Sequence, residues 1–339
     1  MAAVRLAAAL LAALWAAPAR AAEAPPVEKL LESVVDFPAV PYRGELRVTA
    51  FWGGKERVHD ALVAYAPGNK YRWEFLTPGG AVERVAVSDG QREELRLLGR
   101  HPRVLVGDPV GAAPREIDGD TEKALLLKNY VLASGGEATV SGRPAWVLTI
   151  TPRERGKPRQ ELCIDEETGV VLESRRYQPD GQRAEVSRFL SFETGPARDE
   201  DFALSAAAAT APRHGLGPTA ESSADVLKHV PPYLANAKEL PFGFRFDGAD
   251  QLRLSGSPVE HLRWTDGLVA VSLFVTDRPV RPSGRPAAGT ASVRPLDADT
   301  GPARVATWRV RRLHYTLMAN VSEPMLKALK AHLRRGLKG

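Results

Sequence analysis

Cysteine is almost absent from this chain: Cys163 is the single cysteine among 339 residues. One thiol excludes an intramolecular disulfide and a cysteine-rich metal site. Because Cys163 lies in a β-rich run, we expect it to be a small buried hydrophobe rather than a reactive thiol. The seven histidines are scattered, and none has a second histidine or a carboxylate at a convincing ligand spacing. We therefore predict neither a metal site nor a cofactor.

Sequence motifs for catalysis are also missing. The chain contains no GxSxG, HExxH or Walker sequence. The acidic groups at residues 93–94 and 199–201 lack the enclosing cleft that paired catalytic carboxylates require. The sequence thus predicts a protein that is not an enzyme, and a hydrolase ranks last among the functions considered.

Long apolar runs are missing after the N-terminus. Residues 6–17 are apolar, follow Arg5 and precede Pro18-Ala19-Arg20-Ala21, which is typical of a secretory signal peptide. We expect residues 1–21 to be removed and the mature protein to be exported and soluble, because no later run approaches the roughly 18 apolar residues of a membrane span. Loss of Arg5 and Arg20 lowers the net charge from +5 to +3, too weak to indicate nucleic-acid binding.

The chain is rich in strand and turn patterns. Two β-rich runs in residues 160–177 flank a polar turn that ends at Gly169, and a second turn at Pro179-Asp180-Gly181 leads into a third strand. These three strands form a meander, the unit of a wide antiparallel sheet. Further strands are predicted at residues 42–52, 59–66, 70–76, 82–88, 91–98, 137–140 and 146–151, with helices at 27–37 and 121–132. Asp120 or Thr121 is the expected cap of the second helix, which Gly135-Gly136 would end.

Composition then divides the chain. Residues 206–223 are rich in alanine, glycine and proline, which predicts a flexible linker. The following strands are predicted at residues 251–254, 261–264, 268–276, 303–310 and 312–319, and a helix begins at Ser322-Glu323-Pro324. The prediction is an α+β protein with a signal peptide at 1–21, a first domain at 22–205, a linker at 206–223 and a second domain at 224–339.

Two groups of side chains can carry function. Trp52, Tyr71, Trp73 and Phe75 form an aromatic face that either packs as an ordinary sheet–helix core or lines an apolar cavity. A basic C-terminal group is either a solvated face or a docking surface for an acidic partner or an anionic lipid head group. This group consists of Arg309, Arg311, Arg312, Lys327, Lys330, Arg334 and Arg335.

Several short motifs follow one another in a recognisable order. In the first half these motifs are Asn129-Tyr130, Val140-Ser141-Gly142-Arg143, Thr151-Pro152-Arg153, Ile164-Asp165 with Thr168-Gly169 and Leu172, and Asp180-Gly181. In the second half they are Leu240-Pro241-Phe242-Gly243-Phe244, residues 261–268 and residues 272–275. Their order resembles a known family, the RseB/MucB periplasmic regulators of the sigma-E anti-sigma factor, and the resemblance extends from about residue 27 to residue 333.

The resemblance implies a fold and a function. The first domain would be a LolA/LolB-like half-barrel of antiparallel strands, closed by helices over an apolar cavity. The second would be a smaller α+β domain that binds the periplasmic segment of an anti-sigma factor, a single-span inner-membrane protein. Envelope lipid or lipopolysaccharide would relieve the protection of that partner from proteolysis. A LolA-like carrier of lipoproteins or lipids in the periplasm is the alternative, and a homo-oligomer is left open.

Site residues follow from this implied mechanism. The acyl chain of a lipid would bind among Val48, Trp52, Trp73, Phe75 and Trp146. The partner segment would bind to the strands that carry Trp264, Leu268, Phe274, Trp308, Arg311 and Tyr315. No catalytic residue and no metal ligand is predicted.

Overall fold

The computed structural model describes residues 25–109, 115–211, 222–254, 257–277 and 303–337. The predicted signal peptide lies outside these ranges, as does most of the predicted linker, at residues 212–221. The described residues form two antiparallel sheets with helices, in agreement with the predicted α+β class.

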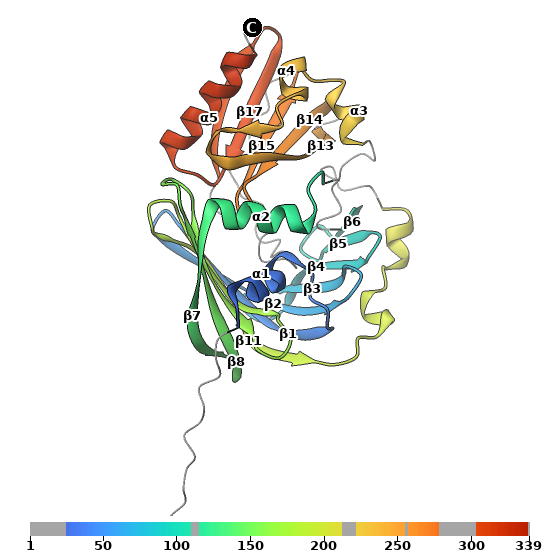
Figure 1. The fold of residues 1–339 in the computed structure, drawn as a ribbon. Helices are drawn as coiled ribbons and strands as arrows, with labels where there is room; N and C mark the ends of the chain where they lie inside the picture. The colour runs from blue at the N-terminus through green and yellow to red at the C-terminus, as the bar shows by residue number, and fades with distance from the viewer. Residues whose placement is uncertain (1–24, 110–114, 212–221, 255–256, 278–302, 338–339) are drawn as a thin grey trace, which may run out of the picture.

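The first sheet has eleven antiparallel strands and curves into a half-barrel (Figure 1). Its strand order is β6-β5-β4-β3-β2-β1-β11-β10-β9-β8-β7. Every pair of neighbouring strands is therefore consecutive in the chain, except β1 and β11. The predicted meander is confirmed. The strands are β1 Tyr42–Trp52, β2 Lys55–Ala66, β3 Lys70–Leu76, β4 Val82–Asp89, β5 Glu93–Leu97, β6 Arg103–Gly107, β7 Tyr130–Val140, β8 Arg143–Pro152, β9 Arg159–Asp165, β10 Val171–Tyr177 and β11 Arg183–Thr194.

Alternation of side chains explains how this sheet acquires a core. In β3 the aromatic residues Tyr71, Trp73 and Phe75 are buried, whereas the intervening Arg72 and Glu74 form an ion pair of 2.5 Å on the other face. The buried aromatic side chains pack with those of neighbouring strands into one cluster. Its aromatic members are Tyr42, Tyr65, Tyr71, Trp73, Phe75, Phe189 and Phe192.

Two helices pack against the sheet: α1 Val27–Val35 lies in the hollow of the half-barrel, and α2 Gly119–Asn129 crosses its upper rim (Figure 1). Helix α1 buries Leu30, Leu31, Val34 and Val35, the apolar stripe that the sequence predicted. These side chains join β8 and β9 residues in a second cluster. The β8 and β9 residues of that cluster are Trp146, Leu148, Ile150, Leu162 and Ile164.

The prediction of a helix over residues 121–132 was wrong at its end. Tyr130 is already extended, and β7 runs through residues 130–140 with a bulge at Gly135-Gly136. A Cβ on Gly135 would approach the Val147 side chain to 2.8 Å, and Gly136 has φ +88°, so the glycine pair permits the bulge instead of ending the helix. The cap was also wrong: the Asp118 side chain accepts from the Thr121 N–H at 2.8 Å.

Two further features of this unit were not predicted. Strand β6 pairs with β5 and extends the sheet by one strand at its edge. After β11, the 3₁₀ helices Asp199–Phe202 and Ala206–Ala209 lie along the sheet, where the buried Glu94 carboxylate accepts from the Ser205 N–H at 2.6 Å. The start of the predicted linker therefore contains a helical turn, in which Ala208 is buried.

The second sheet has six strands in the order β12-β13-β14-β15-β17-β16. Helix α5 Glu323–Gly336 covers it and buries Met325, Leu326, Leu329 and Leu333 in a core centred on Trp264. The strands are β12 Glu239–Leu240, β13 Phe244–Leu254, β14 Ser257–Thr265, β15 Ala270–Thr276, β16 Arg304–Val310 and β17 Leu313–Ala319; the short helices are α3 Ser223–Leu227 and α4 Pro232–Ala235. The curved sheet with its helices is called the first unit below, and this sheet with α3, α4 and α5 is called the second unit.

Candidate functional site

The two units meet where α2 and the start of β7 face two tight loops of the second unit (Figure 1). One loop is the 3₁₀ turn Pro241–Gly243, and the other is the β14–β15 turn around Asp266 and Gly267. Both loops contain positive φ angles, +70° at Phe242 and +80° at Gly243 in the first, +99° at Gly267 in the second. These angles let the backbone approach α2 closely, since a Cβ on Gly267 would lie 2.7 Å from the Leu126 nitrogen.

A buried ion pair connects the units at this junction. The Lys157 ammonium, on the β8–β9 loop of the first unit, lies 2.7 Å from an Asp266 carboxylate oxygen, and both side chains are 1% exposed or less. Lys157 also donates to the Phe242 carbonyl at 2.7 Å, while Asp266 accepts from the Tyr130 hydroxyl at 2.9 Å. Burial, followed by the charge of Asp266, raises the pKa of Tyr130 well above its usual value, so this hydroxyl remains a donor.

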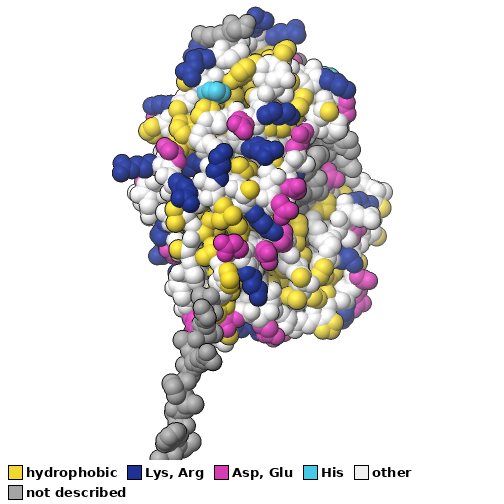
Figure 2. Space-filling model, viewed as in Figure 1, with side chains coloured by type: hydrophobic (Ala, Val, Ile, Leu, Met, Phe, Trp, Pro, Cys, Tyr) yellow, Lys and Arg dark blue, Asp and Glu magenta, His cyan; other side chains and the backbone are white. Residues whose placement is uncertain are grey.

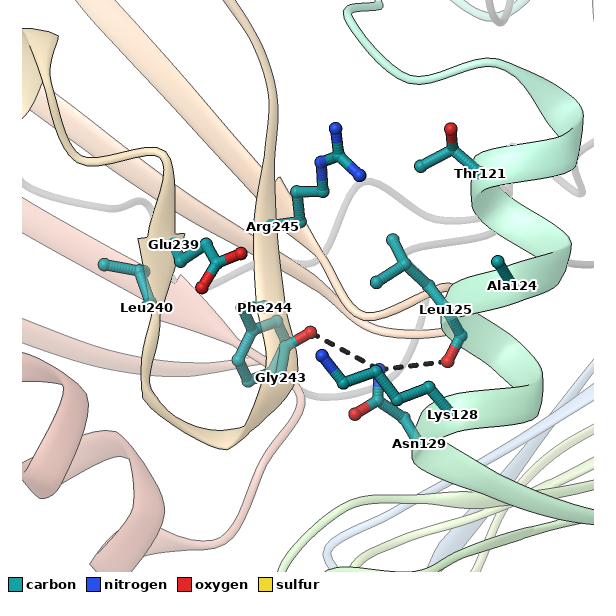
Figure 3. A pocket seen from close by; sticks show the side chains of 10 residues that line it. All are labelled: Thr121, Ala124, Leu125, Lys128, Asn129, Glu239, Leu240, Gly243, Phe244 and Arg245. Atoms are coloured by element: carbon teal, nitrogen blue, oxygen red, sulfur yellow. Dashed lines mark hydrogen bonds between the residues drawn. The ribbon is translucent and has the colours of Figure 1, made fainter.

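Asn129 supplies the second set of hydrogen bonds across the junction. Its amide nitrogen lies within hydrogen-bond distance of the Leu125 carbonyl at 3.0 Å and the Gly243 carbonyl at 3.3 Å, both drawn in Figure 3. The same nitrogen donates to the Asp266 carbonyl at 2.9 Å. A Cβ on Gly243 would overlap this amide, so a glycine is required at that position. Asn129 thereby joins the end of α2 to both loops of the second unit.

A third contact, between Arg115 and Asp247, lies nearby. The Arg115 guanidinium lies 3.0 Å from Asp247 on β13 and 2.9 Å from Glu122 on α2, so one cation bridges carboxylates of both units. Burial raises the pKa of Asp247, and Arg115 opposes this shift. The junction is therefore held by charge and hydrogen bonds as well as by packing.

A pocket of about 520 Å³ opens beside these contacts, between α2 and the strands β12 and β13 (Figure 3). Leu125, Leu240 and Phe244 give it an apolar floor, and Lys128, Glu239 and Arg245 are exposed at its rim. The full lining is Thr121, Ala124, Leu125, Lys128, Asn129, Glu239, Leu240, Gly243, Phe244 and Arg245. A cleft with an apolar floor and charged sides suits a peptide segment or another amphipathic ligand.

The residues predicted to bind lipid are not all together. Val48, Trp73 and Phe75 belong to the aromatic cluster of the first unit, where the rings of Trp73 and Phe75 stack at 6.1 Å. Trp146 lies in the other cluster, against α1 and α2. Trp52 is 50% exposed at the end of β1 and lies in neither cluster.

The residues predicted to bind the partner also do not form one surface. Trp264 is 0% exposed and donates to the Ala237 carbonyl at 2.7 Å, so it stabilises the core. Trp308 and Tyr315 are buried and stack on each other, whereas Arg311 is exposed. Phe274 stacks on His261 at 4.5 Å, and Leu268 packs against the first unit.

Sequence reasoning missed Lys157, Arg115 and Asp247 as junction residues, and it used Asn129 and Asp266 only as motif residues. One signal was available: Lys157 lies between Gly156 and Pro158 in a short loop that separates two apolar strands. Among the described residues, no group of three or more histidine, cysteine or acidic side chains is placed to hold a metal ion. Within the same residues, no helix combines the length and apolar character needed to cross a membrane.

The fold and the junction define a class of protein: a half-barrel of antiparallel strands docked through buried polar contacts onto a smaller α+β unit. Residues 82–212 match the family model of the MucB/RseB N-terminal domain. The sigma factor AlgU regulatory protein MucB of Pseudomonas aeruginosa is 31% identical over 212 residues, which cover 60% of this chain and 63% of that protein.

Solved structures with the same fold include MucB in complex with MucA(peri). That structure is 22% identical, with a TM-score of 0.52 over 90% of this chain and 97% of the solved one. The complex structure of Pseudomonas aeruginosa MucA/MucB is also 22% identical, with a TM-score of 0.50 over 89% and 95% of the respective chains. The resemblance to the RseB/MucB family that the sequence predicted is confirmed by these matches, and the chain spans somewhat less than two thirds of the length of the regulatory protein MucB.

Proposed function

We propose that this protein is a periplasmic regulator without enzymatic activity that binds the periplasmic segment of a membrane-bound anti-sigma factor. The observation that carries the proposal is the shared fold over 90% of the chain with MucB, a protein whose solved structure holds MucA(peri). The sequence relationship to a sigma factor regulatory protein supports the same function. Export through the predicted signal peptide of residues 1–21 would deliver the protein to that partner.

The partner segment would bind on the second unit and extend to the junction. Of the residues predicted for this role, Arg311 offers an exposed charge, and Phe274 and Leu268 are partly accessible. Trp264, Trp308 and Tyr315 would support this surface from within the core. The junction pocket, with its apolar floor and its charged rim, would take a side chain or a turn of the segment.

An acyl chain would control this binding. It would enter beside Val48, Trp73 and Phe75, between the aromatic cluster and α1, and each buried CH₂ would contribute about 0.8 kcal/mol. A ligand shifts an equilibrium only by its differential affinity, so lipid must bind the partner-free arrangement more tightly by a few kcal/mol. The buried junction is the element that both ligands would bias.

A pull-down from envelope extract tests both parts of the proposal. The mature protein is used as bait, with and without added lipopolysaccharide or fatty acid. We expect capture of a single-span anti-sigma protein, and we expect lipid to abolish the capture. Absence of such a protein would reject the regulator, and release of lipoproteins from inner-membrane vesicles would instead favour a carrier.

A pair of variants separates lipid binding from partner binding. Val48→Trp places a bulky side chain at a partly buried position beside the aromatic cluster, whereas Val58→Trp changes an exposed position on the adjacent strand β2. We expect the Val48 variant to capture the partner normally and to lose at least part of the response to lipid, and the Val58 variant to behave like the unchanged protein. Equal lipid responses in both variants would show that the acyl chain does not bind beside this cluster.

A further inference from the structure

The far end of the second unit is strongly basic. The described residues 303–337 carry eight lysines and arginines but one carboxylate, Glu323. Glu323 lies at the first position of α5 and pairs with Lys327 at 2.6 Å. This pair lies at the start of the helix, so it does not neutralise the arginines in the last turn. The adjoining residues 226–238, which include α4, contain no carboxylate either.

The fold gathers these charges at one end. Arg309 lies near the end of β16, Arg312 lies in the turn between β16 and β17, and Arg334 and Arg335 lie in the last turn of α5; all four are exposed. Strand β17 descends from this turn and α5 returns beside it, which places both groups at the upper end of the molecule in Figure 1. Figure 2 shows Lys and Arg side chains there with few acidic ones. These four arginines are called the basic tip.

Contacts at the edge of the sheet keep this end ordered. Lys330 donates to the Thr307 carbonyl at 2.8 Å, and its ammonium lies 5.8 Å from the Trp308 ring centroid, which ties α5 to β16. Arg309 donates to the Arg311 carbonyl at 2.8 Å and steadies the turn. The segments that carry the basic tip are therefore held in place, and within the described part of the chain none of its four arginines forms an ion pair with a carboxylate.

We propose that the basic tip docks on the anionic head groups of a phospholipid bilayer. Its charges come from a turn and a helix end and project from a convex end of the molecule, which suits a broad charged surface. Exposed arginines form bidentate contacts with phosphates, and basic residues near an anionic bilayer each contribute roughly fivefold in affinity. The inference depends on the proposed function only in that the protein works beside a membrane.

Vesicle flotation of the mature protein tests this inference. The vesicles contain phosphatidylcholine alone or phosphatidylcholine with phosphatidylglycerol. We expect binding only to the second kind, and we expect it to weaken as salt is added because screening shortens the range of exposed charges. The triple variant R312E/R334E/R335E should lose affinity by about a hundredfold or more, whereas R312K/R334K/R335K should bind.

A matched control reverses three exposed charges on the first unit, K55E/R57E/R100E, and should leave vesicle binding intact. Circular dichroism establishes that each variant is folded. Absence of binding to anionic vesicles would overturn the inference. Equal losses of vesicle binding in R312E/R334E/R335E and in K55E/R57E/R100E would also overturn it. So would loss of binding to the soluble partner segment in the tip variant alone, because that outcome makes the tip a surface for an acidic peptide. The partner pull-down in detergent extract tests the proposed function separately, since none of these residues belongs to the predicted partner set.

Discussion

Lys157 is a charged side chain held between two units, and its removal leaves the buried Asp266 carboxylate without its counter-ion. The substitution Lys157→Met keeps the length of the side chain and removes its charge. We expect it to lower the free energy of unfolding by roughly 3–5 kcal/mol, the cost of leaving one partner of a buried ion pair uncompensated. Urea denaturation followed by tryptophan fluorescence measures this change.

Two further variants show whether the loss belongs to the pair. The double variant K157M/D266N removes both charges and should recover part of the stability, because the remaining groups are neutral. Lys327→Met breaks the exposed Glu323–Lys327 pair on α5 and should cost less than about 0.5 kcal/mol. Equal effects of the two single lysine substitutions would show that Lys157 does not hold the junction.

At the scale of the element, the hairpin turn between β9 and β10 depends on Asp165. Its buried carboxylate accepts from Arg143 at 2.7 and 2.9 Å and from the Thr168 N–H at 3.0 Å. Burial raises the pKa of Asp165, but the hydrogen bonds from Arg143 and Thr168 outweigh it and hold the pKa below its usual value. A carboxyl group whose pKa is lower in the folded state stabilises the fold at any pH above its unfolded-state pKa. This contribution is lost as the pH falls through the folded-state pKa.

Asp165→Asn should therefore lower stability by roughly 2–3 kcal/mol at neutral pH, because it removes charged hydrogen bonds from a buried site. Its stability should also fall less steeply than that of the unchanged protein below about pH 4. The measurement is urea denaturation across an acid pH series. Asp199→Asn is the control, since that carboxylate is exposed and solvent screens its ion pair with Lys70, so its profile should lie close to that of the unchanged protein. Parallel acid profiles for Asp165→Asn and the unchanged protein would contradict the prediction.

The sequence predicted elements better than the contacts between them. Alternation in residues 70–76 correctly placed β3 and its buried aromatic face, because period-2 burial is a local property. The end of α2 was missed because Leu132 continues an apolar helical spacing, whereas the chain becomes a strand where β7 pairs with β8. The pairing of Lys157 with Asp266 could not be predicted, since 109 positions separate them and only the packing of the two units brings them together.

At the scale of the whole molecule, we expect the proposed switch to act by separating the two units, and a covalent link across the junction tests this expectation. The Ser322 N–H donates to the Gly156 carbonyl at 2.7 Å, and a Cβ on residue 156 would lie 3.3 Å from the Ser322 Cβ. This separation is close to the roughly 3.5–4.5 Å between Cβ atoms in disulfides. Cys163 is buried and should not compete for the new thiols.

The double variant G156C/S322C should therefore form a disulfide, at a cost of about 1–3 kcal/mol because Gly156 has φ +98°. Thiol titration measures its formation. The oxidised protein should capture the partner but retain it when lipid is added, and reduction should restore the release, since only the reduced form can separate its units. The single variant S322C, oxidised in the same way, controls for the added thiol and should release normally. Lipid-driven release from the fully oxidised double variant would show that the two sites communicate without separation of the units, and the coupling would then have to pass through α2 within a closed junction.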